Sequence, residues 1–290
     1  MSVAFCVGTG RCGTTFVSQL AGAEDEVAAS HERLRLAATF HMYCSWHGIS
    51  VDPGGFLVDR DAAVRRDLVD HRISFESSAL LSHSIAALDT RFSPQWLLLV
   101  RRPDATVSSF SVRGWFEDLA PHGDPDLPPS YRQGEEPRHF FGRILPRGKE
   151  ERDRFQTSTP LGRVAWFWQA RNRAILKQLG ELPASRVRIA RLEDLDFEAW
   201  VEIAGFLGWS VSFSADEFRA LADRRPNAGP NTPRSPAHWT ERERREFERE
   251  VAEVAAALGY RHQLSTLEAD GNARIRPAPT VAEALVRLHR

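Results

Sequence analysis

The sequence predicts an α/β protein in which helices cover both faces of a central parallel sheet. Three observations lead to this fold class. Short apolar runs bounded by turn residues alternate with segments of helical periodicity, a glycine-rich loop follows the first apolar run, and the last third of the chain is mainly helical. Strands that alternate with helices form a parallel sheet, because each helix carries the chain back to the same edge. We therefore expect a three-layer α/β/α fold with a mainly helical C-terminal portion.

The predicted strands are short and almost wholly apolar, which is typical of strands that are buried on both faces. In chain order they are Val3–Val7, Val27–Ala29, Ile73–Phe75, Trp96–Val100 and Val187–Ala190.

Helical patterns connect these strands and continue after the last one. The helices are expected from about Thr14 and over Asp61–Val69, Ala79–Leu88, Pro103–Arg113, Leu161–Leu179, Glu198–Leu207, Ala215–Ala222 and Glu241–Leu258.

One domain is expected over residues 1–265 of the 290-residue chain, which is long enough to bury a substantial core. Within it, residues 114–160 combine proline and glycine with several aromatic residues and lack regular periodicity. A long segment of this kind in a compact domain is usually functional, so it is predicted to be a substrate lid or insertion. Its aromatic residues include Trp115, Phe116, Phe140 and Phe141. Residues 266–290 are predicted to form a C-terminal tail that is mobile from Glu268, with a short helix at Val281–Leu288.

Composition and charge exclude several classes of protein. The net charge of -1 argues against general nucleic-acid binding. The longest strongly apolar run, Trp96–Val100, is too short to span a bilayer, and the N-terminus lacks the pattern of a signal peptide. The three cysteines, Cys6, Cys12 and Cys44, have neither metal spacing nor a disulfide framework. We expect a reduced, cytoplasmic protein without membrane insertion.

The basic residues are almost all arginine. Only Lys149 and Lys177 are lysines among 38 basic side chains. Any anion site in this chain must therefore be built mainly from guanidinium groups, which bind phosphate through two N–H groups at once.

The glycine-rich loop Gly8–Thr15 is placed to bind phosphate, because it follows a strand and opens a helix whose first N–H groups are available. It is not a Walker A loop, since Thr14 stands where that motif has lysine. The strand Trp96–Val100 ends in Arg101 and Arg102, not in the acid that would hold magnesium. The pattern indicates a nucleotide donor whose chemistry needs no metal.

Two segments carry a resemblance to a known family. Val7–Thr15 resembles the 5'-phosphosulfate loop of the sulfotransferases that use 3'-phosphoadenosine-5'-phosphosulfate (PAPS). Leu97–Phe110 resembles the 3'-phosphate segment of the same family, in which an apolar strand is followed by Arg, by Pro two residues later and by Ser eight residues after the Arg. Arg101 and Ser109 keep this spacing. Arg234-Ser235-Pro236 is similar, more weakly, to a late basic loop that covers the cofactor.

The resemblance implies a P-loop kinase-like architecture and in-line transfer of a sulfuryl group from PAPS, with adenosine 3',5'-bisphosphate as the product and no metal. It implies cofactor binding by Gly10, Arg11, Cys12, Gly13, Thr14, Thr15, Arg101, Ser109 and Arg234. Arg11 is also implied in catalysis, because it faces the transferred group.

The acceptor must lose a proton, and a carboxylate or histidine can take it. Many members of the family carry a glutamate just after the second strand, and Glu32 is the residue at that place. His31 and Glu76 are alternatives, and Glu32 could instead be a first-turn acid of the next helix. Relatives often have a third-strand lysine where Phe75-Glu76-Ser77-Ser78 has serine, so Arg11 or another arginine must support the transferred group.

The expected acceptor is a small molecule, such as a bacterial secondary metabolite, that offers a hydroxyl or an amine. Two other functions stay open. One is a nucleotide kinase-like phosphotransferase with an altered P-loop, and the other is a catalytically inactive nucleotide-binding protein.

Overall fold

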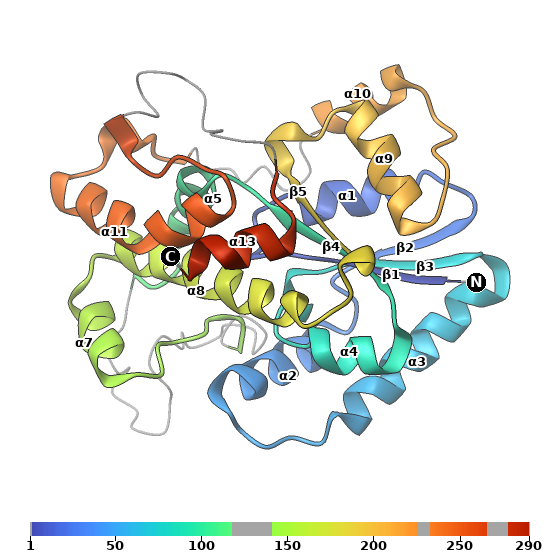
Figure 1. Cartoon of the computed structure of the whole chain (residues 1–290), viewed down its shortest axis with the longest axis horizontal. Coiled ribbons are helices and arrows are strands. Elements are labelled where there is room, and N and C mark those ends of the chain that lie inside the picture. Colours follow the sequence, from blue (N-terminus) through green and yellow to red (C-terminus); the bar gives the residue numbers. More distant parts are fainter. Residues whose placement is uncertain (1, 118–140, 225–232, 266–277, 290) are drawn as a thin grey trace.

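Five parallel strands form the central sheet of the computed structural model, in the order β2-β3-β1-β4-β5 (Figure 1). The structure describes residues 2–117, 141–224, 233–265 and 278–289. The strands are β1 (Ser2–Val7), β2 (Val27–His31), β3 (Ile73–Ser77), β4 (Gln95–Val100) and β5 (Val187–Arg191). Every predicted strand is confirmed, each one or two residues longer than its apolar run. The predicted fold class is confirmed as well.

Helices connect the strands and make up most of the C-terminal portion. Those described are α1 (Thr14–Ala21), α2 (Arg35–His47), α3 (Pro53–Asp70), α4 (Ile85–Phe92), α5 (Pro103–Ser111), α7 (Lys149–Thr157), α8 (Pro160–Gly180), α9 (Phe197–Leu207), α10 (Ala215–Asp223), α11 (Glu241–Ala257) and α13 (Val281–Leu288). Short 3-10 turns include η1 (Ala79–Leu81), η2 (Ala184–Arg186) and η3 (Leu192–Asp194).

One predicted helix, Ala79–Leu88, is wrong as a single element. The chain instead forms η1, turns at Ser82–Ser84, and then begins α4. Two side chains of α8 hold this turn. The Ser82 hydroxyl accepts from Arg171 Nε at 2.8 Å and the Ser82 carbonyl accepts from Gln178 Nε2 at 2.9 Å. These bonds to α8 take the place of helical ones, and apolar periodicity could not reveal them.

Two helices, α2 and α7, are not predicted by the sequence patterns. The buried face of α2 contains Ala38, Met42 and Trp46 but also the polar Thr39 and His41. His41 Nδ1 lies 2.8 Å from the Ser84 hydroxyl. Because this helix packs partly through polar groups, its apolar periodicity is weak.

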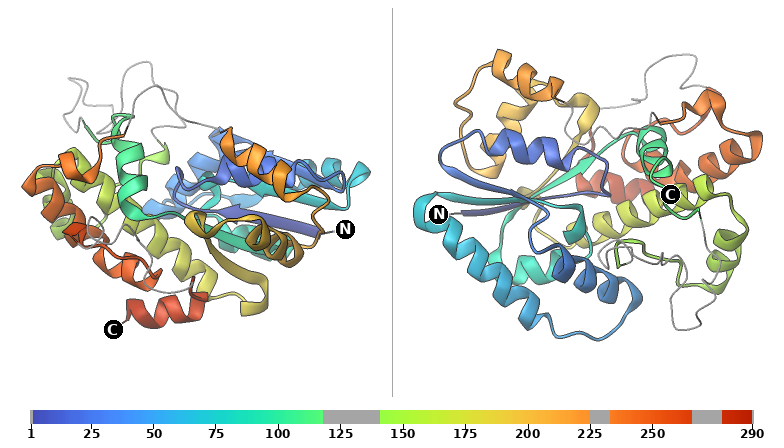
Figure 2. Two further views of the ribbon diagram at one scale, coloured as in Figure 1. Left: turned by 90° about the horizontal axis from the view of Figure 1, so that it is seen from above. Right: turned by 180° about the vertical axis from the view of Figure 1, so that it is seen from behind.

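Alternate residues of each strand face different helical layers, as the period of a strand requires. Ala4 and Cys6 of β1 pack in the layer with α1, α9 and α10, whereas Phe5 and Val7 pack in the larger core with α4, α5 and α8. Figures 1 and 2 show α1, α9 and α10 on one side of the sheet and α2, α3 and α4 on the other. Both faces are therefore covered, which confirms the predicted three layers.

The C-terminal helix belongs to this body. The short helix predicted at Val281–Leu288 is present as α13, and its buried side, which includes Val281, Ala284 and Leu288, packs against α8 and α11. It is therefore packed against the core, unlike the mobile tail that was expected. Residues 266–277 and the central part of the predicted lid, 118–140 with Phe140, lie outside the described residues.

The strand order decides where a ligand can bind. β1 and β4 are neighbours, yet the chain leaves β1 toward β2 on one side and leaves β4 toward β5 on the other. Connections that diverge in this way leave a crevice at the carboxyl ends of the two strands, and open α/β sheets bind ligands there. The Gly8–Thr15 loop follows β1 and Arg101 follows β4, so both motifs lie at this point.

Candidate functional site

The glycine loop turns sharply from β1 into α1. Gly10, Arg11 and Gly13 have positive φ angles of 86°, 56° and 102°. At Gly8 the loop runs so close to β4 that a Cβ atom would lie 2.5 Å from the Leu99 carbonyl oxygen. The N-cap of α1 is Gly13, which has no side chain to offer as a cap. The first N–H groups of α1 therefore form the kind of site that binds a phosphate or sulfate oxygen.

Arg11 joins the two predicted motifs. Its Nε donates to the Ser109 hydroxyl at 2.9 Å, and its carbonyl oxygen accepts from an NH group of Arg101 at 3.2 Å. Ser109 is buried on α5, and Arg101 lies directly after β4. The structure thus brings together Arg11, Arg101 and Ser109, which are 98 residues apart at most.

Arg11, Arg101 and Arg113 form a cluster of positive charge. Burial, together with the charges of Arg113 and Arg101, lowers the pKa of Arg11 to about 10. Such repulsion is relieved when an anion binds between the guanidinium groups. Sequence reasoning missed Arg113, although its place four residues after Ser109 is a spacing that puts two side chains on one face of a helical segment.

His31 contacts the same loop from β2. Its Nε2 lies 3.2 Å from the hydroxyl oxygens of both Thr14 and Thr15. Burial lowers the pKa of His31 from 6.5, while the neighbouring Glu32 opposes that shift. This shift favours the neutral imidazole, whose Nε2 can accept a hydrogen bond from one of the two hydroxyls.

Glu32 follows His31 at the same edge of the sheet. Its N–H donates to the Ser77 carbonyl at 3.2 Å, and its carboxylate has a long ion pair with Arg35 at 3.9 Å. The charge of Glu32 also opposes the lowering of the pKa of Arg11, although its effect is smaller than that of burial and of the neighbouring arginines. Because α2 begins only at Arg35, Glu32 lies before the helix and is not a first-turn acid.

Glu76 has a different environment from Glu32. It is buried at the end region of β3, forms an ion pair with the fully buried Arg60 and accepts a hydrogen bond from the Arg33 N–H at 3.1 Å. A carboxylate with these partners is a structural group, which argues against the third candidate for the base.

Arg171 supports the glycine loop from inside the protein. This fully buried side chain on α8 donates to the carbonyl oxygens of Thr9 at 3.3 Å and Ala79 at 2.5 Å. Its burial lowers its pKa to about 10. Sequence patterns could not assign this role, since it depends on where α8 crosses the loop.

Arg234 lies near the site through its backbone. Its carbonyl accepts from the Ser108 hydroxyl at 3.0 Å, which sets this segment beside α5. Its guanidinium is paired with Glu243 at 2.7 Å. The remaining predicted residues, Gly10, Cys12 and Gly13, are part of the loop itself, and Cys12 is fully buried.

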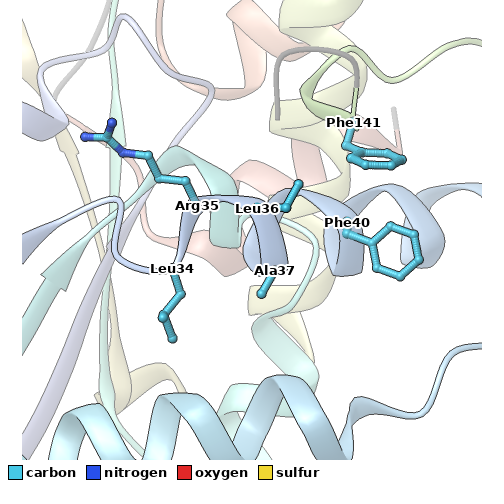
Figure 3. A pocket seen from close by; sticks show the side chains of 6 residues that line it. All are labelled: Leu34, Arg35, Leu36, Ala37, Phe40 and Phe141. Atoms are coloured by element: carbon cyan, nitrogen blue, oxygen red, sulfur yellow. The ribbon is translucent and has the colours of Figure 1, made fainter. Parts of the chain in front are cut away.

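An open, mainly apolar pocket of about 630 Å³ lies at the start of α2, two residues after Glu32 (Figure 3). It is lined by Leu34, Arg35, Leu36, Ala37, Phe40 and Phe141. The rings of Phe40 and Phe141 meet edge to face with their centroids 5.2 Å apart. Figure 3 shows Arg35 extending away from these two rings. The pocket thus has an apolar lining with two aromatic rings at one end.

Within the described parts of the chain, no group of three or more His, Cys, Asp or Glu side chains is arranged to hold a metal ion. Among the same residues no helix is both long and apolar enough to cross a membrane. The cysteines, all of them described, are buried and form no disulfide.

Comparison with known proteins gives a structural likeness only. No family model and no curated protein matches the sequence. Among solved structures, the chain is similar to the sulfotransferase domain from the Synechococcus PCC 7002 olefin synthase, with 14% identity over 100% of this chain and 94% of that chain and a TM-score of 0.46. It is also similar to the sulfotransferase domain from the curacin biosynthetic pathway, with 13% identity over 88% of this chain and 97% of that chain and a TM-score of 0.46. With TM-scores below 0.5, this likeness does not assign a function.

Proposed function

We propose that this protein is a sulfotransferase that uses PAPS as the sulfuryl donor. The observation that carries the proposal is the cluster of Arg11, Arg101, Arg113 and Ser109 at the mouth of the glycine loop. Three guanidinium groups close enough to repel one another suit a ligand with more than one phosphate or sulfate group. The kinase alternative is weaker, because Thr14 replaces the Walker lysine and β4 is followed by Arg101 where an acid would hold magnesium.

The two sides of the cluster suit two parts of the donor. The N–H groups at the start of α1, with Arg11, Thr14 and Thr15, are proposed to hold the 5'-phosphosulfate. Arg101 and Ser109 are proposed to hold the 3'-phosphate. When bound, PAPS supplies the sulfuryl group and a bisphosphate leaving group. Positive charge fixed beside the leaving oxygen is then the main catalytic contribution of the protein.

Glu32 is proposed to take the proton from the acceptor. It directly follows His31, which ends β2 and contacts Thr14 and Thr15 of the loop, and the apolar pocket begins two residues later. An acceptor held there can present its hydroxyl or amine to Glu32. The lining by Leu36, Phe40 and Phe141 favours a small molecule with an apolar or aromatic body.

Calorimetry of two nucleotides tests the proposal. Adenosine 3',5'-bisphosphate should bind at least tenfold more tightly than AMP, because a charge-assisted contact to the 3'-phosphate is worth roughly 1.5–3 kcal/mol and 1.4 kcal/mol is a factor of ten. Arg101→Ala should remove most of that difference. The matched control is Arg65→Ala on the exposed face of α3, which should keep the full preference. Equal affinity of the unmodified protein for both nucleotides would overturn the assignment.

A turnover assay separates an enzyme from a binding protein. Incubation with PAPS and a panel of phenols, alcohols and amines should release the bisphosphate at a rate that depends on the acceptor. Tight bisphosphate binding without turnover of any acceptor would favour the inactive nucleotide-binding protein.

A further inference from the structure

The backbone around the proposed base has an uncommon conformation. Glu32 and Leu34, on either side of Arg33, have positive φ angles of 49° and 53°. Residues with a Cβ atom rarely adopt this left-handed region, and the surrounding structure must hold them there. Two such residues flanking one position indicate that residues 32–34 are constrained by neighbours.

A buried ion pair holds the peptide groups of Arg33. The carboxylate of Glu76 accepts from the Arg33 N–H at 3.1 Å, and an NH group of Arg60 donates to the Arg33 carbonyl at 3.2 Å. Arg60 and Glu76 are also paired with each other and are 0% and 3% exposed. One pair, from α3 and β3, therefore binds both polar backbone groups of the residue next to Glu32.

Further contacts complete this arrangement. The Arg33 guanidinium is paired with Asp67 at 2.8 Å, and Asp67 also accepts from the Ser74 hydroxyl at 2.6 Å. The Glu32 N–H donates to the Ser77 carbonyl at 3.2 Å. The turn between β2 and α2 is thus bonded to β3 and α3 through both its backbone and its side chains.

We propose that Arg60 and Glu76 are positioning residues, which hold the turn so that Glu32 is directed at the glycine loop. The inference rests on the proposed function of Glu32. Stability alone is a poor reason for this pair, because the desolvation of two buried charges can exceed their attraction. Positioning is a better reason, since a displacement of about 1 Å in a catalytic group can lower the rate roughly 100-fold.

The test removes the pair without leaving a lone buried charge. In Arg60→Met/Glu76→Leu both hydrogen bonds to Arg33 are lost, and apolar side chains of similar size fill the space. We expect kcat to fall roughly 10–100-fold, while the KM for PAPS and the Kd of the bisphosphate stay within about threefold. The control, Arg186→Met/Asp89→Leu, removes an ion pair that joins η2 to α4 at the other end of the sheet, and it should leave kcat unchanged.

A crystal structure of the double variant gives a second readout that needs no catalysis. Glu32 and Leu34 should leave the left-handed region, and the Glu32 carboxylate should move away from the loop. If this backbone is unchanged, or if kcat is unchanged while only the melting temperature falls, the positioning role is wrong. If the unmodified protein binds no bisphosphate, the proposed function fails, but the backbone of the variant still decides whether the pair holds the turn.

A milder variant covers the case in which the double variant does not fold. Arg60→Lys keeps the charge beside Glu76, but a single ammonium cannot reproduce the fork that reaches both Glu76 and the Arg33 carbonyl. The same loss of kcat, smaller in size, and the same backbone shift are expected. An unchanged kcat and an unchanged backbone in this variant would overturn the proposal.

Discussion

Glu32 and His31 are neighbours in the chain, but the structure gives them different partners. His31 lies within hydrogen-bond distance of the hydroxyls of Thr14 and Thr15, at the start of α1. Glu32 has a long ion pair with Arg35, which lines the apolar pocket. This division favours His31 as the group that orients the loop hydroxyls and Glu32 as the group that meets the acceptor.

Glu32→Gln should therefore lower kcat by about 10²–10⁴-fold, because glutamine keeps the size of glutamate but cannot accept the proton. Affinity for the bisphosphate should change by less than a few-fold, since that ligand contains no acceptor. The measurement is a PAPS turnover assay beside calorimetry of the bisphosphate. Glu26→Gln, at the other end of β2, is the control and should be fully active. Activity within a few-fold of the unmodified enzyme would move the assignment to His31.

At the scale of elements, the strand-to-helix junction after β1 depends on its glycines. Gly13 has a φ of 102°, and a Cβ atom there would lie 2.6 Å from a Leu192 methyl group in η3. A leucine methyl can move aside, but the backbone angle cannot be adopted cheaply by a residue with a Cβ atom. The shape of the loop, and with it the anion site, should be sensitive to this position.

Gly13→Ala should lower the free energy of unfolding by roughly 1–3 kcal/mol and weaken bisphosphate binding, because the left-handed conformation is strained for alanine. Gly205→Ala is the matched control. Gly205 lies within α9, and a Cβ atom added there would meet no other atom within 4 Å, so alanine should stabilise the protein by roughly 0.5–1 kcal/mol. Denaturant unfolding measures both. Equal effects at the two glycines would contradict the role of the φ angle at Gly13.

The strands and helices also show which elements the sequence patterns could predict and which they could not. Apolar runs were sufficient for all five strands: β3 and β4 are almost wholly buried, and the edge strands β2 and β5, although partly exposed, still contain apolar runs. They were insufficient for α2, whose buried face includes His41, and for the break before α4, which depends on bonds from Arg171. In both cases the deciding interaction comes from a partner distant in the chain.

In the candidate site, too, the sequence identified some residues and only the structure identified others. The resemblance of Leu97–Phe110 to a 3'-phosphate segment singled out Arg101 and Ser109, and the structure places both in contact with Arg11 of the glycine loop. Sequence patterns did not identify Arg60, because its role depends on where α3 packs against β3.

At the scale of the whole molecule, the strand order determines where the site lies, and the C-terminal helices complete the larger hydrophobic core. β1 and β4 lie side by side and send the chain in opposite directions, so their loops form the crevice. On one face, α8 packs with α11 and α13 in a single apolar cluster with the strands. The last helix therefore contributes to the stability of the body that positions the site.

This contribution can be tested with two alanines of α13. Ala284 is fully buried against the core, whereas Ala282 is exposed on the same helix. Ala284→Asp places a carboxylate in an apolar cluster and should lower the free energy of unfolding by roughly 2–4 kcal/mol, which corresponds to a drop in Tm of about 5–15 °C for a chain of this size. Ala282→Asp adds the same group on the solvent side and should change the free energy of unfolding by less than about 0.5 kcal/mol. Thermal unfolding of both variants is the measurement. Equal melting temperatures would mean that the helix does not pack in solution as it does here, and that residues 278–289 behave as the mobile tail that the sequence suggested.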